Sequence, residues 1–171
     1  MIIWLTGLSA SGKTTLGRHI CDLWRAEEPN TVIIDGDEIR NILKYNSGDA
    51  YSEESRRIVA GHYCDLCAWL DHQDINAVCC TISSFEDLRA RNRETFSKYF
   101  EVYIEVPMEV AYRRDVKNLY APALAGKMKN VVGVDLPFTP PSAADMVVDN
   151  SQDRDDLRPI AADILKRACA S

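Results

Sequence analysis

An eight-residue stretch near the start of the chain has the residue types and spacing of a phosphate-binding loop. Gly7-Leu8-Ser9-Ala10-Ser11-Gly12-Lys13-Thr14 fits G-x-x-x-x-G-K-[ST] at every fixed position and directly follows the apolar run Ile2–Leu5. A strand that ends in such a loop and opens a helix aims backbone N–H groups and the positive end of the helix dipole at one anion. A chance glycine turn is the alternative, but both the strand and an amphipathic helix pattern are present. The residues expected to bind nucleotide phosphates are Gly7, Ser9, Ala10, Ser11, Gly12, Lys13, Thr14 and Thr15.

Two carboxylates flank a glycine after the second apolar run. Asp35-Gly36-Asp37 follows Thr31–Ile34, and Arg40 comes three residues after Asp37. One carboxylate there can hold the water shell of Mg²⁺ or accept a proton from an attacking hydroxyl, and the arginine can bind a phosphate through two hydrogen bonds. The alternative is helix capping by Asp37 and a surface arginine. The position beside a phosphate loop favours the functional interpretation.

The third apolar run ends in Thr81-Ile82-Ser83-Ser84, without the aspartate that GTPases and motor ATPases use there. This favours a small-molecule kinase, with the metal held by Thr14 and an acidic residue of the second strand. Residues 115–141 show no clear period, and a segment that long in a compact domain is often an active-site lid. The basic residues expected to close with this lid are Arg113, Arg114, Lys117, Lys127 and Lys129.

Strand and helix patterns alternate along the chain. The expected strands are 2–6, 31–34, 75–82, 100–106 and 146–149, and the expected helices include 13–25, 52–72, 86–97 and 157–168. Such alternation predicts an α/β fold with a five-stranded parallel sheet, helices on both faces and a lid. Because ligands bind beyond the carboxyl ends of parallel strands, the motifs can converge on one cleft.

Composition is that of an ordinary globular protein. The 171 residues fit a single domain, 1–171, and the net charge of −6 argues against nucleic-acid binding. No apolar run approaches the length that spans a bilayer, and the chain starts on a core strand rather than a signal peptide. We therefore expect a cytoplasmic protein with no membrane partner.

The six cysteines are expected to be reduced, packed thiols. Cys64-x-x-Cys67 has half the spacing of a zinc site, but no second pair stands at ligand spacing and both residues fall in a helical apolar pattern. Cys79-Cys80 lies in a strand-like run, and Cys21 and Cys169 are isolated. Metal or redox function is the alternative.

Taken together, the motifs resemble those of adenylylsulfate (APS) kinases. The segments Gly7–Thr14, Ile34–Arg40 and Arg114–Asp135 follow the family's order, and the likeness covers roughly residues 2–150. It implies a P-loop kinase, usually a homodimer, that uses ATP and Mg²⁺ to phosphorylate the 3′-hydroxyl of a nucleotide conjugate. The implied catalytic residues are Lys13, Asp35 and Asp37, with Thr14 and Asp35 at the metal and Arg114 at ATP. The implied acceptor-binding residues are Asp37, Arg40, Tyr51, Arg56, Ile82, Ser83, Lys117 and Val131.

The positions that contact the base depart from the family pattern. Tyr51, Val59 and Val131 correspond to a phenylalanine, an asparagine and a second phenylalanine of APS kinases. Losing a stacking face and a polar base contact costs about 1–3 kcal/mol each in adenine binding. The family resemblance makes adenylylsulfate the first expected acceptor, and these departures weaken adenine binding.

A branch of the family offers the alternative acceptor. The Thr81–Phe85 turn and the segment Asn130–Asp135 resemble a branch that includes cytidine diphosphoramidate kinase, whose smaller base would tolerate valine in the lid. A non-catalytic nucleotide-binding module is more remote, because Lys13 and Asp35 are both present. A kinase for sugars or shikimate-like acids would lack this lid and the D-G-D-x-x-R turn.

Overall fold

The structure, a computed structural model, describes residues 1–46 and 48–171, and within these ranges five parallel strands form one sheet in the order β2-β3-β1-β4-β5. The strands are β1 (Ile2–Thr6), β2 (Thr31–Asp35), β3 (Asn76–Cys80), β4 (Tyr99–Glu105) and β5 (Met146–Asp149). The helices are α1 (Lys13–Glu27), α2 (Gly36–Ile42), α3 (Glu53–Asp71), α4 (Glu86–Thr95), α5 (Met108–Arg114), α6 (Tyr120–Leu124) and α7 (Arg158–Ala170), with a 3₁₀ turn over Gly48–Tyr51.

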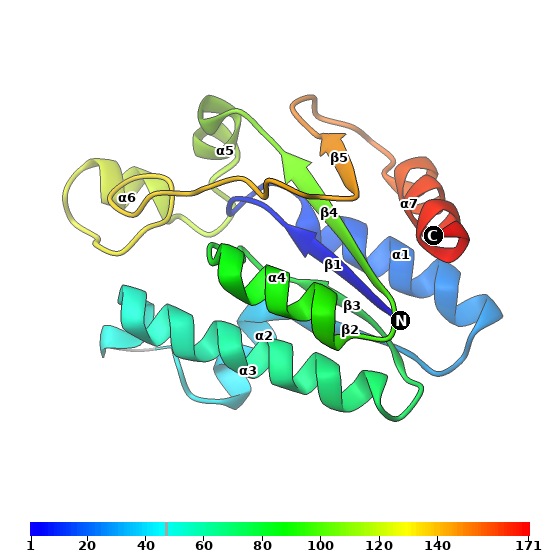
Figure 1. Ribbon diagram of the computed structural model, residues 1–171. Helices are drawn as coiled ribbons and strands as arrows, with labels where there is room; N and C mark the ends of the chain where they lie inside the picture. Colours follow the sequence, from blue (N-terminus) through cyan, green and yellow to red (C-terminus); the bar gives the residue numbers. More distant parts are fainter. Residues whose placement is uncertain (47) are drawn as a thin grey trace.

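Helices cover both faces of the sheet, which confirms the predicted fold. Figure 1 shows α1 and α7 on one face and α3 and α4 on the other, while α5 and α6 lie beyond the carboxyl ends of the strands. The chain leaves β1 for one side of the sheet and later returns to the other side. The loop after β1 therefore lies at the point where the strand order reverses, which is where such sheets bind ligands.

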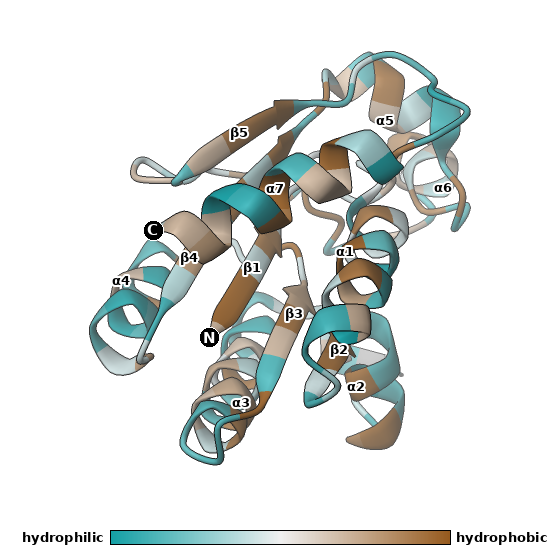
Figure 2. Cartoon of the chain, turned by 90° about the vertical axis from the view of Figure 1, so that its right-hand side faces the viewer, coloured by the Kyte–Doolittle hydropathy of each residue, from teal (hydrophilic) through white to brown (hydrophobic). Residues whose placement is uncertain are grey.

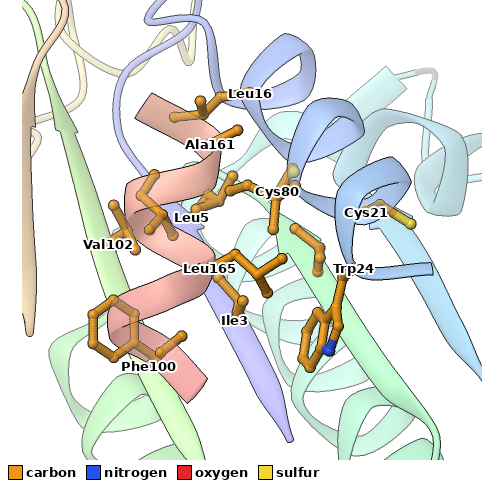
Figure 3. Packing of buried hydrophobic residues seen from close by; sticks show 14 of the residues in the cluster. Ile3, Leu5, Leu16, Cys21, Trp24, Cys80, Phe100, Val102, Ala161 and Leu165 are labelled. Atoms are coloured by element: carbon orange, nitrogen blue, oxygen red, sulfur yellow. The ribbon is translucent and has the colours of Figure 1, made fainter. Parts of the chain in front are cut away.

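The central strand β1 is buried on both faces. Ile3 and Leu5 belong to the cluster shared with α1 and α7, and Ile2 and Trp4 belong to the cluster under α3. Figure 3 shows side chains from β1, β3, β4, α1 and α7 meeting in the first of these clusters. In Figure 2, β1 and β5 are largely hydrophobic, whereas α1 and α7 mix hydrophobic and hydrophilic residues. Burial on two faces explains why β1 reads as a continuous apolar run.

Some element boundaries differ from the sequence-based prediction. The strand expected over 75–82 ends at Cys80, because the Ile82 carbonyl accepts from the Thr6 hydroxyl rather than from a strand N–H, and the chain turns at Ser83, whose φ is 53°. The helix expected to open at Ser83-Ser84 instead has Phe85 as its N-cap residue and ends at Thr95. Ser52 caps α3 as expected, accepting a hydrogen bond from the Ser55 N–H.

Val59, which stands where the family pattern has an asparagine, is a core residue. Its side chain is 0% exposed in the core cluster beneath α3. Helical spacing is the physical reason, since Val59 lies on the same inward face as Tyr63 and Cys67. Figure 1 shows α3 lying along the sheet, so this face points to the core.

Five cysteines are packed as expected. Cys21, Cys64, Cys67, Cys79 and Cys80 are buried, and none of the six forms a disulfide within the described residues. Burial raises the pKa of the Cys64 thiol to about 11, so it stays protonated. The exception, Cys169, is exposed near the end of α7. No helix in the described part of the chain is both long and apolar enough to cross a membrane.

Candidate active site

A cleft of about 770 Å³ lies at the carboxyl-end rim of the sheet. Its walls come from the loop after β1, the turns after β2 and β3, the residues after β5 and the segment 116–132. The predicted site residues that line it are Ser9, Ala10, Gly12, Lys13, Thr14, Thr15, Asp35, Asp37, Arg40, Tyr51, Arg56, Ile82, Ser83, Arg114, Lys117 and Val131. Gly7 and Ser11 stand behind this wall and shape the loop.

The loop after β1 requires glycine at two positions. Gly7 has a φ of 152°, and a Cβ there would lie 2.6 Å from the Ile104 carbonyl oxygen. Gly12 has a φ of 95°, and a Cβ there would lie 2.7 Å from Asn150 Nδ2. Gly12 is also the N-cap of α1, which has no capping side chain. The first-turn N–H groups of a 15-residue helix therefore remain available for an anion.

Lys13 lies across the loop that precedes it. Its Nζ donates to the Leu8 carbonyl (2.6 Å) and to Ser11 Oγ (3.3 Å). Burial lowers the pKa of Lys13 to about 8, while the nearby Asp37 and Asp35 carboxylates oppose that shift. The negative charge of a bound phosphate would raise the pKa of Lys13 again, because anionic partners favour the ammonium form.

Thr14 and Asp35 bring two oxygen ligands together. Thr14 Oγ1 donates to Asp35 Oδ2 at 2.7 Å, and Asp35 Oδ1 accepts from the N–H groups of Asp37 (2.9 Å) and Glu38 (3.4 Å). Asp35, not Asp37, is therefore the N-cap of α2. A hydroxyl oxygen and a carboxylate oxygen suit Mg²⁺, which takes few ligands from the protein and fills its remaining positions with water and substrate phosphates. The residues present thus fit the expected metal.

The segment 115–141 closes one side of the cleft. Lys117 forms an ion pair with Asp37, and the Tyr120 hydroxyl donates to the Ser9 carbonyl at 3.2 Å. Asp115 accepts three backbone N–H groups at the start of α6, which fixes the bend that precedes this short helix. The segment also carries Val131, which is 6% exposed in an apolar cluster with the phosphate loop and α5. The lid is thus anchored on the phosphate loop.

Two arginines and a tyrosine form the wall opposite the phosphate loop. The guanidinium carbons of Arg40 and Arg56 lie 4.9 and 5.4 Å from the centroid of the Tyr51 ring. Arg40 donates to the Ala50 carbonyl (2.9 Å) and Arg56 to the Asn130 carbonyl (2.6 Å). Burial, and then the charge of Arg40, lowers the pKa of Arg56. Carbonyls carry no net charge, so two cations face the cleft and favour an anionic ligand.

The turn after β3 completes the wall. Thr6 Oγ1 donates to the Ile82 carbonyl at 2.7 Å, and Trp4 Nε1 donates to Ser83 Oγ at 3.1 Å. Both donors come from β1, the strand that also carries the phosphate loop. One strand therefore supports both sides of the cleft.

Sequence reasoning missed several residues of the cleft. Tyr63 lines it and donates to the Gly36 carbonyl at 2.8 Å, and Asn150 donates to the Ser11 carbonyl at 2.9 Å. Asp153 lies beside the predicted Arg114, with the ion pair at 2.8 Å. Asn150 follows β5 directly, so the rule that ligands lie at strand ends would have found it. Tyr63 carried no such signal, because its spacing on α3 is that of a core residue.

Comparison with known proteins agrees with this geometry. The sequence profile of the adenylylsulphate kinase family matches residues 1–149. A cytidine diphosphoramidate kinase of Campylobacter jejuni is 39% identical over 150 residues, 88% of this chain and 86% of that protein. An adenylyl-sulfate kinase of Halothermothrix orenii is 33% identical over 144 residues, 84% of this chain and 77% of that protein.

Solved structures give the same result. The Mycobacterium tuberculosis APS kinase, in complex with AMPPNP and APS, has a TM-score of 0.83 at 26% identity, over 99% of this chain and 97% of that one. A shikimate kinase of Aquifex aeolicus, at 17% identity and a TM-score of 0.54, shares the fold alone, covering 99% of this chain and 94% of its own. The chain belongs to the adenylylsulphate kinase family and is a small-molecule kinase.

Proposed function

We propose that the protein transfers the γ-phosphate of Mg·ATP to the 3′-hydroxyl of a nucleotide conjugate. The observation that carries this proposal is that one cleft holds a complete phosphate loop opposite a wall of two arginines and a tyrosine. The loop suits a triphosphate, and the arginines suit the anionic part of an acceptor. Tyr51, 37% exposed, offers a ring on which a base can stack.

Each charged residue of the cleft has its own role in the proposed transfer. Lys13 binds the β- and γ-phosphates, and Asp37 takes the proton of the hydroxyl as the new O–P bond forms and the bond to ADP breaks. Bound Mg²⁺ would neutralise charge on the phosphates, next to Thr14 and Asp35. Lys117 reaches the same region from the lid, where its ion pair with Asp37 supports a role close to the transferred group. Positioning and charge neutralisation are the main requirements of such a transfer.

Two acceptors are candidates. Adenylylsulfate is supported by the family profile and by the M. tuberculosis structure, whose protein binds APS. Cytidine diphosphoramidate is supported by the C. jejuni relative and by Val131, a buried aliphatic residue where the family pattern has a second aromatic ring. Of the two positions where the family pattern has a phenylalanine, only one, Tyr51, therefore carries an aromatic ring here. This favours the cytidine conjugate, because a pyrimidine loses less stacking than adenine does.

Product analysis tests the transfer. With either conjugate and Mg·ATP, ³¹P NMR should show a new phosphomonoester coupled to the ribose H3′. A 3′-deoxy analogue of the same conjugate should release no ADP above the acceptor-free rate. Phosphorylation of the 3′-deoxy analogue would overturn the assignment of the hydroxyl.

The variant Val131→Phe tests the base assignment. Restoring a second ring should raise the kcat/KM ratio of the adenosine over the cytidine conjugate about fivefold, since a stacked pair contributes about 1 kcal/mol. Val147→Phe is the matched control, because Val147 is 56% exposed on β5, away from the cleft. An unchanged ratio in Val131→Phe, with a normal melting temperature, would show that Val131 does not face the base.

The homodimer and the cytoplasmic location stay predictions.

A further inference from the structure

The turn after β3 has a backbone conformation that needs support. Ser83 has a φ of 53°, a left-handed conformation that is unfavourable for a non-glycine residue. The Ile82–Ser84 segment lines the acceptor side of the cleft and lies between β3 and α4, outside either element. Its geometry therefore depends on the side chains that bind it.

One of these side chains lies behind the cleft wall. The guanidinium of Arg89, on α4, donates to the Ser83 carbonyl and forms an ion pair with Glu86. Its side chain is only 2% exposed, as is rare for an arginine. It therefore approaches the acceptor site from the protein interior.

A second buried charge fixes Arg89 in place. Arg89 Nε lies 3.0 Å from Glu101 Oε1 on β4, and the Glu101 side chain is 4% exposed. The other carboxylate oxygen of Glu101 lies 3.5 Å from Arg93, which in turn pairs with Asp145 at 3.0 Å. A row of alternating charges thus runs from the strand region to the turn. Moving one partner of a buried ion pair away leaves an uncompensated buried charge, so Arg89 and Glu101 hold each other in position.

We propose that Arg89 is a positioning residue for the acceptor, acting through the backbone of Ser83 and held in turn by Glu101. The proposal rests on the proposed function, because it concerns the acceptor side of the same cleft. An arginine suits this role, since its planar guanidinium donates to the Ser83 carbonyl and pairs with both Glu86 and Glu101. A lysine keeps the charge but cannot reach three partners in one plane.

Steady-state kinetics of Arg89→Lys test the proposal. The KM of the acceptor should rise about tenfold, while the KM of ATP should stay within twofold, because the phosphate loop does not contact Arg89 in the described structure. Arg91→Lys is the matched control on the same helix, since Arg91 is exposed and pairs with Asp65 at 3.0 Å. It should change neither KM.

Hydrogen exchange gives a readout that does not depend on turnover. In Arg89→Lys, amides in the 81–86 peptide should exchange at least threefold faster, and those of β1 and α1 should not change. Glu101→Gln should shift both readouts in the same direction by a smaller amount, which keeps the proposal testable if Arg89→Lys does not fold. Equal rises in both KM values, or unchanged exchange in the 81–86 peptide, would overturn it. Failure of the proposed function would instead appear in the wild-type protein, as no turnover of either conjugate.

Discussion

Replacing Asp35 by asparagine should separate its chemical role from its structural one. One carboxylate oxygen caps α2, and the other accepts the Thr14 hydroxyl proton at 2.7 Å. Asparagine keeps a carbonyl for the cap, and its amide can donate to Thr14 once the hydroxyl turns. The substitution therefore removes the negative charge and little else.

The two effects differ in size. Asparagine and aspartate are about equal as N-cap residues, so Asp35→Asn should cost less than ~0.5 kcal/mol of folding free energy. Asp35→Ala loses the cap, which costs about 1 kcal/mol and lowers the melting temperature by roughly 2–4 °C for a chain of this size. Both variants lose the charge next to the metal, so kcat should fall by about 10²-fold or more.

The assay combines ADP release, nucleotide affinity and thermal unfolding of both variants. We expect both kcat values to collapse, ATP affinity to change much less, and only Asp35→Ala to melt early. A wild-type kcat in Asp35→Asn would refute the catalytic role. A rise in KM with normal kcat would show that Asp35 binds substrate without serving the transfer step.

Three further predictions follow from the same cleft. Lys13→Ala should abolish turnover with an unchanged melting temperature, because Lys13 Nζ contacts only its own loop among the described residues; near-normal turnover would contradict the loop assignment. Because the pKa of Lys13 is lowered to about 8, its ammonium group loses its proton as the pH rises through 8, and ATP affinity measured by calorimetry should fall. An ATP affinity that stays constant from pH 7 to 9 would show that this charge does not bind ATP. Arg56→Ala should raise the KM of the acceptor about tenfold and leave ATP affinity alone, and Arg40→Ala should do the same while also losing stability, because Arg40 is buried. Weakened ATP binding in either arginine variant would mean that the two subsites are interchanged.

Local patterns account for what the sequence predicted well. The phosphate loop is a contiguous pattern, so Gly7, Gly12, Lys13 and Thr14 identify it together with the strand before it and the helix after it. The turn Asp35–Asp37 follows a buried strand, and strand ends meet at one rim in a parallel sheet. Both features can therefore be placed at the cleft from the sequence alone.

Contacts between distant segments could not be predicted in this way. Lys117 and Asp37 are 80 residues apart, and Asn150 reaches Ser11 across 139 residues. Arg89 had the sequence context of a solvated helix face, yet it is buried against Glu101. Val59 stands where the family pattern has a base-contacting asparagine, yet its helical spacing on α3 indicates the core, where the structure has it. Helical periodicity was the better guide there, since it follows from backbone geometry.

The most direct test of the central claim is a coupled ADP-release assay with wild-type protein and Mg·ATP, comparing adenylylsulfate with cytidine diphosphate conjugates such as the diphosphoramidate. Our account predicts acceptor-dependent ADP release, with a higher kcat/KM for the cytidine conjugate because Val131 stands where the family pattern has a second phenylalanine. Faster turnover of adenylylsulfate would show that Val131 does not determine the base. ADP release that neither conjugate stimulates would contradict the assignment of a nucleotide-conjugate kinase.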